Sequence, residues 1–213
     1  MKIALIGATG FVGSALLNEL ANRGHAVTAI ARNPAENDKA NWVKVDVTKS
    51  DELAKVLENH DVVISAYNPG WENPNIYADF IAGSKDIQAV VKKSGVKRYI
   101  TIGGGGSLFV APGVQAVDTP DFPKEYYPGA TAARDYLNII REEKDLDWVF
   151  FSPAFEMHQG ITTGRTGKYR LGLENPVFDA DNRSILSVED LAVVIADEAE
   201  NPKHRQQRFT AAY

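Results

Sequence analysis

The glycine-spaced segment Gly7-Ala8-Thr9-Gly10-Phe11-Val12-Gly13 constrains the fold of this chain more than any other feature. It follows a short apolar run, Lys2–Ile6, and opens a segment of helical periodicity, Phe11–Arg23. Between a strand and a helix, such glycines permit a tight turn, close approach of the backbone to a pyrophosphate, and close helix–strand packing. A simple bend is the alternative, but strand, turn and helix in register favour a nicotinamide dinucleotide site. The cofactor-binding residues predicted here are Gly7, Thr9, Gly10, Phe11, Val12 and Gly13.

The rest of the chain alternates between strand-like and helix-like segments, which is typical of a parallel α/β sheet. The predicted fold is a Rossmann-type, doubly wound parallel sheet in one domain, 1–213, with residues 153–213 adding a small substrate-side lobe. Residues 109–124 hold three prolines and are predicted as a loop. The predicted strands are Lys2–Ile6, Val27–Ala31, Trp42–Val47, Asp61–Tyr67, Arg98–Ile102, Trp148–Ser152 and Arg208–Ala211. The predicted helices are Phe11–Arg23, one beginning at Ser50, Ile76–Ser94, Gly129–Glu143, and one from Ser187 to about Glu200.

Composition excludes several classes of protein. The 213 residues carry a net charge of −5 with scattered Lys and Arg, so no nucleic-acid partner is expected. The absence of cysteine excludes disulfides and thiolate metal sites and fits a reducing cytoplasm. The four histidines lie far apart without ligand spacing, so no metal is expected. No apolar run approaches the roughly 18 residues of a membrane span, and we expect a soluble cytoplasmic protein.

The end of the second predicted strand bears on which dinucleotide binds. NAD enzymes usually place a carboxylate about 20 residues after the glycine turn, where it holds the ribose 2′-hydroxyl. Here the sequence reads Ala31-Arg32-Asn33, and no carboxylate occurs before Glu36. The guanidinium of Arg32 suits a 2′-phosphate, although solvated arginines at strand ends are common. We therefore predict NADP in preference to NAD. Asp46, after the third strand, is predicted to face the adenine amino group, with a simple turn residue as the alternative.

Rossmann-type reductases of alcohols and ketones usually hold a Tyr-x-x-x-Lys pair, in which the lysine lowers the pKa of a proton-donating tyrosine. None of the eight tyrosines has a lysine four residues later; after Tyr127 the residue at this position is Thr131. Either the reaction needs no strong proton donor, or the protein is not an enzyme. Tyr126 and Tyr127 remain as catalytic candidates without a lysine partner.

Six segments spread over nearly the whole chain carry a family resemblance: Gly7–Gly13, Ala31–Pro34, Val45–Thr48, Ile102–Leu108, Ser152–Ala154 and Thr166–Arg170. Together they resemble the atypical short-chain dehydrogenases known as NAD(P)H-binding proteins or NADH-flavin reductases. Flavin/biliverdin-IXβ reductases are similar, and NmrA-like dinucleotide sensors and sugar epimerases more distantly so. The resemblance matches Ser107 to a serine position near the nicotinamide, which adds it to the catalytic candidates. There it could hydrogen-bond the substrate or the carboxamide, with a simple turn serine as the alternative. The other predicted cofactor-binding residues are Val47, Ser65, Ala66, Tyr67, Ile102, Gly103, Ser152 and Pro153.

The resemblance implies an NAD(P)H-dependent reductase that passes hydride to a flavin, FMN or FAD, or to a similar planar acceptor. This agrees with the missing lysine, because a flavin ring delocalises the charge and solvent can supply the proton, whereas a carbonyl forms a localised alkoxide. Trp71 and Phe155 are candidates to stack on the acceptor, beside Gly104, although packing is their commoner role. Two alternatives stay open: a non-catalytic NADP(H) redox sensor, and a nucleotide-sugar epimerase or dehydratase. A small-molecule substrate is the expected partner.

Overall fold

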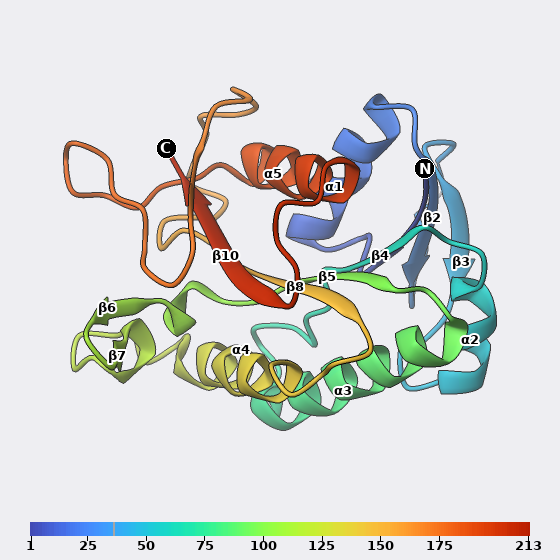
Figure 1. Cartoon of the computed structure of the whole chain (residues 1–213), viewed down its shortest axis with the longest axis horizontal. Coiled ribbons are helices and arrows are strands. Elements are labelled where there is room, and N and C mark those ends of the chain that lie inside the picture. Colours follow the sequence, from blue (N-terminus) through green and yellow to red (C-terminus); the bar gives the residue numbers. More distant parts are fainter. Residues whose placement is uncertain (36) are drawn as a thin grey trace.

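An eight-stranded sheet forms the centre of the molecule (Figure 1). The computed structural model describes residues 1–35 and 37–213, and within them the strand order is β3-β2-β1-β4-β5-β8-β10-β9. The pairings in this sheet are parallel, except that β9 runs antiparallel to β10. The central strands are buried on both faces, which is why they read as apolar runs. The strands are β1 (Lys2–Ile6), β2 (Ala26–Ala31), β3 (Asn41–Lys44), β4 (Val62–Ser65), β5 (Arg98–Ile102), β8 (Asp147–Ser152), β9 (Arg170–Gly172) and β10 (Gln207–Ala212).

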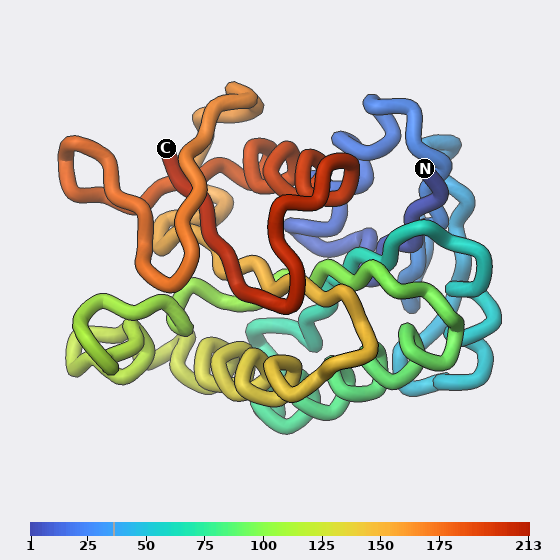
Figure 2. Tube along the Cα trace, in the orientation of Figure 1, coloured from blue at the N-terminus to red at the C-terminus, as the bar shows by residue number. Residues whose placement is uncertain are grey.

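Helices cover both faces of this sheet (Figures 1 and 2). On one face α1 packs against α5, and the core beneath them includes Leu16 and Leu191. On the other face α3 contacts both α2 and α4, over a second cluster that includes Ile87 and Leu137. Burial of the apolar side of each helix against the sheet therefore holds the layers together. The helices are α1 (Phe11–Asn22), α2 (Ser50–Leu57), α3 (Ile76–Ser94), α4 (Tyr127–Ile140) and α5 (Val188–Glu200).

The predicted Rossmann-type fold class is confirmed, although two strands are shorter than predicted. β3 stops before Asp46, whose carboxylate accepts the N–H of Thr48 at 3.0 Å and closes a turn. β4 stops before Tyr67, whose hydroxyl donates to the carbonyl of Asp79 at 3.1 Å and directs the side chain toward α3. In both places one more backbone bond to the neighbouring strand follows, from Val45 to Ala31 and from Ala66 to Ile6, and the chain then turns away through the local polar contact.

The segment predicted as a loop, residues 109–124, contains a small hairpin. Its strands are β6 (Phe109–Ala111) and β7 (Val114–Gln115), and Gly113 between them has a φ of +73°. Short 3₁₀ turns precede and follow it, η1 (Gly105–Ser107) and η2 (Ala116–Asp118). The prolines correctly indicated irregular chain, but a two-residue strand is too short to leave a recognisable pattern in the sequence.

Part of the segment 153–213 is built into the main sheet and its helical layer. β10 lies between β8 and β9, with its side chains buried from Arg208 onward, and α5 packs on α1. The remainder of the segment is largely irregular, and its assignment to the substrate stays a prediction. Among the helices of the described residues, none combines the length and apolar character required to cross a membrane.

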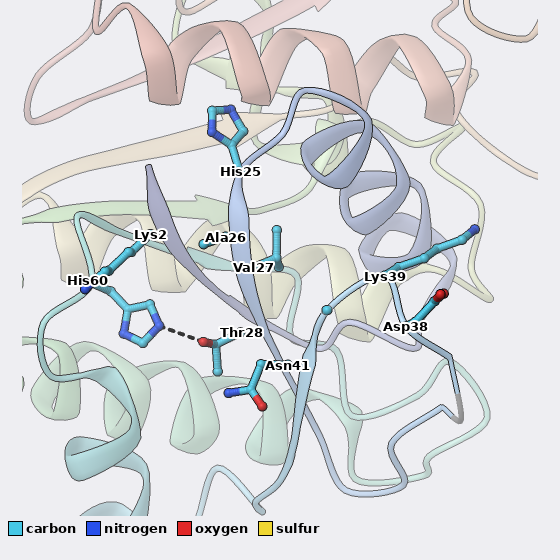
Figure 3. Close-up of a pocket in the computed structure, with 10 residues that line it drawn as sticks. Lys2, His25, Ala26, Val27, Thr28, Asp38, Lys39, Asn41 and His60 are labelled. Carbon is cyan, nitrogen blue, oxygen red and sulfur yellow. Dashed lines mark hydrogen bonds between the residues drawn. The ribbon is translucent and has the colours of Figure 1, made fainter.

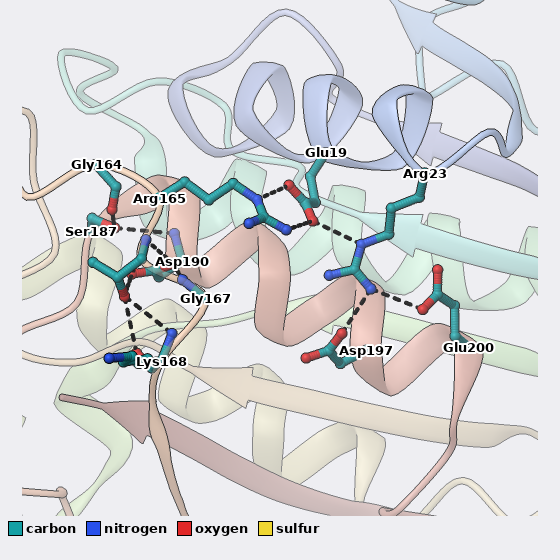
Figure 4. A network of polar contacts seen from close by, with 11 residues as sticks. Glu19, Arg23, Gly164, Arg165, Gly167, Lys168, Ser187, Asp190, Asp197 and Glu200 are labelled. Atoms are coloured by element: carbon teal, nitrogen blue, oxygen red, sulfur yellow. Dashed lines mark hydrogen bonds and ion pairs between the residues drawn. The ribbon is translucent and has the colours of Figure 1, made fainter.

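An ion-pair network fastens residues 164–168, here called the strap, to α1 and α5 (Figure 4). The Glu19 carboxylate on α1 accepts from Arg165 at 2.8 and 2.9 Å and from Arg23 at 2.7 Å. These guanidinium groups hold the pKa of Glu19 below its usual value, with Arg165 the larger influence. Asp190, buried in the first turn of α5, accepts the N–H groups of Thr166 and Gly167. The strap therefore has a charged anchor on each helix.

Candidate dinucleotide site

The three glycines of the predicted cofactor turn are required for different reasons. Gly7 has a φ of +79°, and a Cβ there would lie 2.6 Å from the carbonyl oxygen of Ala66. A Cβ on Gly13 would lie only 2.0 Å from the carbonyl oxygen of Gly7. A Cβ on Gly10 would meet that same oxygen at an ordinary 3.4 Å. The protein itself thus demands glycine at positions 7 and 13, whereas position 10 leaves space that a ligand can use.

The turn leads directly into α1, whose amino terminus is open. The Gly10 carbonyl accepts the N–H of Ser14 at 2.8 Å, and no side chain caps the helix. The first turn of α1 carries no acidic residue. N–H groups in a first turn lack intrahelical acceptors, and the helix dipole adds positive potential there. The exposed residues Thr9, Gly10 and Phe11 therefore border a surface suited to a pyrophosphate.

The carboxyl ends of β1 and β4 meet at this turn. These strands are neighbours in the sheet, although β2 and β3 come between them in the chain. The Ala66 N–H donates to Ile6 O at 2.9 Å, which brings Ser65, Ala66 and Tyr67 beside Gly7. A reversal of strand order of this kind forms the crevice in which doubly wound folds bind nucleotides. The predicted contacts from β4 therefore converge on the predicted turn.

Arg32 and Asp46 follow β2 and β3, where the ribose and the adenine are predicted to bind. Arg32 is exposed just beyond β2. The Asp46 Oδ1 accepts from the N–H and hydroxyl of Thr48, at 3.0 and 2.9 Å. These bonds, first the one from the N–H, lower the pKa of Asp46, and the positive charge of Arg32 adds to the effect. The carboxylate thus shapes its own turn, and the predicted contacts of Asp46 and Val47 with adenine stay predictions.

Residues 103–106 are all glycine, and this glycine run continues the site at the carboxyl ends of β5 and β8. A Cβ on Gly103 would lie 1.8 Å from the ring of Phe150, and one on Gly105 would lie 2.6 Å from Pro153 O. The Gly103 N–H donates to Phe151 O at 2.8 Å. The run therefore packs directly against β8, and it brings together Ile102, Gly103, Gly104, Ser152 and Pro153 from the predicted set.

Ser107, a catalytic candidate, lies behind this run. Its side chain is fully buried, and its hydroxyl donates to Gly104 O at 2.8 Å. The same oxygen lies 2.9 Å from the hydroxyl of Ser152 and 3.2 Å from Nη1 of Arg208. These contacts give Ser107 a structural role, which agrees with the alternative of a turn serine. The catalytic role stays a prediction, and it would require the turn to open.

Exposed aromatic side chains surround the same end of the sheet. Trp71 meets the ring of Tyr126 edge to face, with 5.5 Å between centroids. Both rings are about half exposed, as is Tyr127 at the start of α4. Phe155 lies 3.4 Å from the Cβ position of Gly105. Phe155 thus lies beside the glycine run, and the stacking of Phe155 and Trp71 on an acceptor stays a prediction.

Two residues of this region were missed by sequence reasoning. Phe178, which pairs with the ring of Phe155 at 6.3 Å, lies in irregular chain without a recognisable pattern. Arg208 carries a weak signal, because arginine is unusual in a strand as apolar as Phe209–Ala212. Within residues 1–35 and 37–213, no cluster of three or more His, Asp or Glu side chains is placed to hold a metal ion.

A separate cavity of about 400 Å³ lies at the amino-terminal ends of β1 and β2 (Figure 3). Its lining includes Lys2, Thr28 and His60, and none of the predicted site residues. The His60 Nδ1 donates to Leu57 O at 3.0 Å, so its Nε2 accepts from the Thr28 hydroxyl at 2.8 Å. Because doubly wound folds bind nucleotides at the carboxyl ends of strands, this cavity is not the predicted dinucleotide site.

Known proteins share both the sequence and the fold of this chain. The model of the family described as NAD(P)H-binding matches residues 7–202. A “putative epimerase” from Bacteroides thetaiotaomicron is 47% identical with a TM-score of 0.90, over 100% of this chain and 96% of that one. A “putative exported protein” from Burkholderia pseudomallei is 41% identical with a TM-score of 0.90, over 100% of both chains. A “putative NADH-flavin reductase” from Streptococcus pneumoniae is 31% identical with a TM-score of 0.89, over 100% and 99%.

These three similar proteins carry three different descriptions. Their fold agrees with the strand–turn–helix geometry above, and the matched family agrees with a dinucleotide on the glycine turn.

Proposed function

Because this chain belongs to the NAD(P)H-binding family, we propose that it is a reductase that passes hydride from NAD(P)H to a flavin or a similarly planar acceptor. The observation that carries the proposal is the set of side chains around the glycine run, where the acceptor would bind. There the glycine run lies beside Phe155, and α4 carries Thr131 four residues after Tyr127, where a carbonyl reductase would hold lysine. Such a surface suits a flat ring and offers no lysine-activated tyrosine.

The chemistry of a flavin fits this surface. Nicotinamide supplies a hydride, which is two electrons and one proton, and a flavin ring accepts it with the charge spread over several atoms. Water can supply the second proton, so no positioned general acid is needed. Gly10 and the open end of α1 hold the pyrophosphate in this proposal, while Phe155 and Trp71 stack on the acceptor.

We propose NADPH as the preferred donor, because Arg32 stands exposed beyond β2, where an NAD enzyme usually holds a carboxylate. We further propose that the protein works on small molecules in the cytoplasm, where reduced nicotinamide is available. The similar Burkholderia protein is described as exported, so fractionation of producing cells is the direct test of location.

Anaerobic oxidation of NADPH and NADH, with FMN, FAD or no acceptor, tests the reductase. We expect flavin-dependent turnover by the wild-type protein above the rate without protein. The Gly10→Val variant is the matched control, and it should show the background rate. Turnover that is equal in the two proteins, or absent in both, would overturn the proposal.

A second candidate, a non-catalytic NADP(H) sensor, is favoured by the complete burial of Ser107. Tight binding of NADPH and NADP⁺ with different affinities, without turnover on any acceptor, would support it. The epimerase alternative lacks the Tyr–Lys pair on which such enzymes usually depend, and we do not propose it.

A further inference from the structure

Arg208 is a buried cation for which the proposed reaction has no direct use. It lies in β10 with a side chain that is 0% exposed. Its Nη1 donates to Ser107 O at 2.8 Å, and its Nη2 pairs with the carboxylate of Glu174. Its Nε is buried and finds no acceptor among the described residues. A buried guanidinium is costly to desolvate, so its contacts are expected to define one geometry closely.

The direction of the hydrogen bonds shows what Arg208 holds. The single hydroxyl proton of Ser107 goes to Gly104 O, so the 2.9 Å contact with Ser152 has the Ser152 hydroxyl as donor. Ser107 then accepts from Ser152 and from Arg208 at once. One connected set of bonds therefore joins β10, the end of β8 and the turn after β5.

The Nη2 group of Arg208 faces Glu174, which lies in the irregular chain just after β9. Glu174 also accepts from Arg141, just beyond α4, at 3.0 Å, and its carbonyl accepts the N–H of Phe109 at 2.9 Å. The ring of Phe109 lies 5.6 Å from the Arg208 guanidinium carbon, within range of a cation–π contact. The hairpin strand β6, the chain around Glu174 and the glycine run thus share one central side chain.

We propose that Arg208 is a positioning residue, which holds the Gly103–Ser107 turn in a fixed position relative to β6 and the chain around Glu174, and so shapes the surface that the acceptor approaches. This inference rests on the proposed function, because that function places the nicotinamide against this turn. Arg208 itself touches neither cofactor nor acceptor. Hydride transfer is sensitive to such placement, since a displacement of about 1 Å can cost about 100-fold in rate.

The Arg208→Lys variant tests the planar fork of donors while keeping the charge. An ammonium group cannot bridge Ser107 and Glu174 with the same geometry. We expect kcat for flavin reduction to fall at least about tenfold, with KM for the flavin nearly unchanged, and a larger isotope effect with 4-deuterated NADPH. The affinity for ADP-ribose, or for its 2′-phosphate, should stay within about twofold. The residues predicted to bind the ribose and adenine follow β2 and β3, which are separated from β10 by four strands of the sheet or more.

Two further variants keep the test decisive. Glu174→Gln leaves Arg208 in place but removes its counter-charge. It should likewise lower kcat while KM for the flavin and the affinity for ADP-ribose stay nearly unchanged, so the test does not depend on the folding of Arg208→Lys. Arg205→Lys is the matched control, because Arg205 is exposed and pairs with Asp147. The kcat of this variant should equal that of the wild type. Thermal unfolding of every variant establishes that the fold is intact.

The outcomes separate this inference from the proposed function. If the wild type does not reduce flavin, the proposed reductase function is wrong. The inference is then tested by comparing wild type and variants in their affinity for NADPH, in their affinity for ADP-ribose, and in the fluorescence of bound NADPH. A variant that loses affinity for NADPH but keeps its affinity for ADP-ribose supports the inference. Equal loss of ADP-ribose affinity, or a folded Arg208→Lys variant that behaves as wild type in every measurement, would overturn it.

Discussion

Gly10 and Gly13 lie three residues apart on the cofactor turn, yet they should respond to substitution in different ways. Gly10→Val places its branch where only the ligand is expected, so dinucleotide binding should be lost while the melting temperature changes little. Gly13→Ala forces a Cβ to 2.0 Å from Gly7 O, and it should destabilise the fold by about 1–3 kcal/mol or more. Calorimetric titration and thermal unfolding of both variants check this. Unchanged affinity in the Val variant would refute the assignment of the turn.

At the ribose, Arg32→Ala should weaken binding of NADPH much more than binding of NADH. A hydrogen bond to a charged group contributes about 1.5–3 kcal/mol, so the affinity for NADPH should fall about tenfold or more. Dissociation constants for both cofactors, measured side by side, give the answer. Equal losses would mean that Arg32 does not contact the 2′-phosphate.

Among the tyrosines, Tyr126→Phe and Tyr127→Phe should each lower flavin reduction only modestly. Neither has a lysine four residues later, and a flavin acceptor requires no positioned acid. Loss of a general acid would instead cost about 100-fold or more. Steady-state rates with cofactor binding measured in parallel distinguish the two cases. An inactive variant that still binds NADPH would favour carbonyl reduction or epimerisation.

At the scale of elements, the strap is held to α1 by a carboxylate whose pKa is lowered, and this predicts a pH dependence. A folded-state pKa below the usual 4.5 means that ionised Glu19 stabilises the fold above that pH, and that this contribution is lost as the pH falls through the folded-state pKa. Glu19→Gln should lower the free energy of unfolding at pH 7 by about 1.5 kcal/mol. The difference from wild type should shrink below pH 4.5.

Denaturant unfolding of the Glu19→Gln variant at several pH values measures this effect. Asp51→Asn is the control, since Asp51 pairs with Lys93 on an exposed surface and should leave stability almost unchanged. A difference between Glu19→Gln and wild type that stays constant with pH would show that the Glu19 charge does not fasten the strap.

At the scale of the whole molecule, the last strand completes the sheet. Phe209 in β10 is fully buried and meets the ring of Phe151 edge to face, with 4.9 Å between centroids. Phe209→Ala should therefore cost about 3–5 kcal/mol. Phe178→Ala, which truncates a partly exposed ring, should cost far less. Denaturation curves of the two variants test whether the carboxyl-terminal strand belongs to the cooperative core, and equal losses would argue against it.

The sequence alone was sufficient for the features that depend on near neighbours. The first strand, the glycine turn and α1 follow from spacing within some 20 residues, because turn conformation and helix periodicity are local properties. The parallel α/β class follows from the repetition of such units. This class also explains why the predicted cofactor residues lie together, because the carboxyl ends of parallel strands meet at one edge of the sheet.

Only the tertiary structure decided the features that depend on distant partners. The sequence left Ser107 either as a hydrogen-bonding group near the nicotinamide or as a turn serine. Its buried contacts with Ser152 and with Arg208, which lies 101 positions away, are visible only in the structure. The three-residue strand β9 forms only because β10 lies beside it. Pairing between residues so far apart is set by packing of the whole sheet, and no local period in the sequence encodes it.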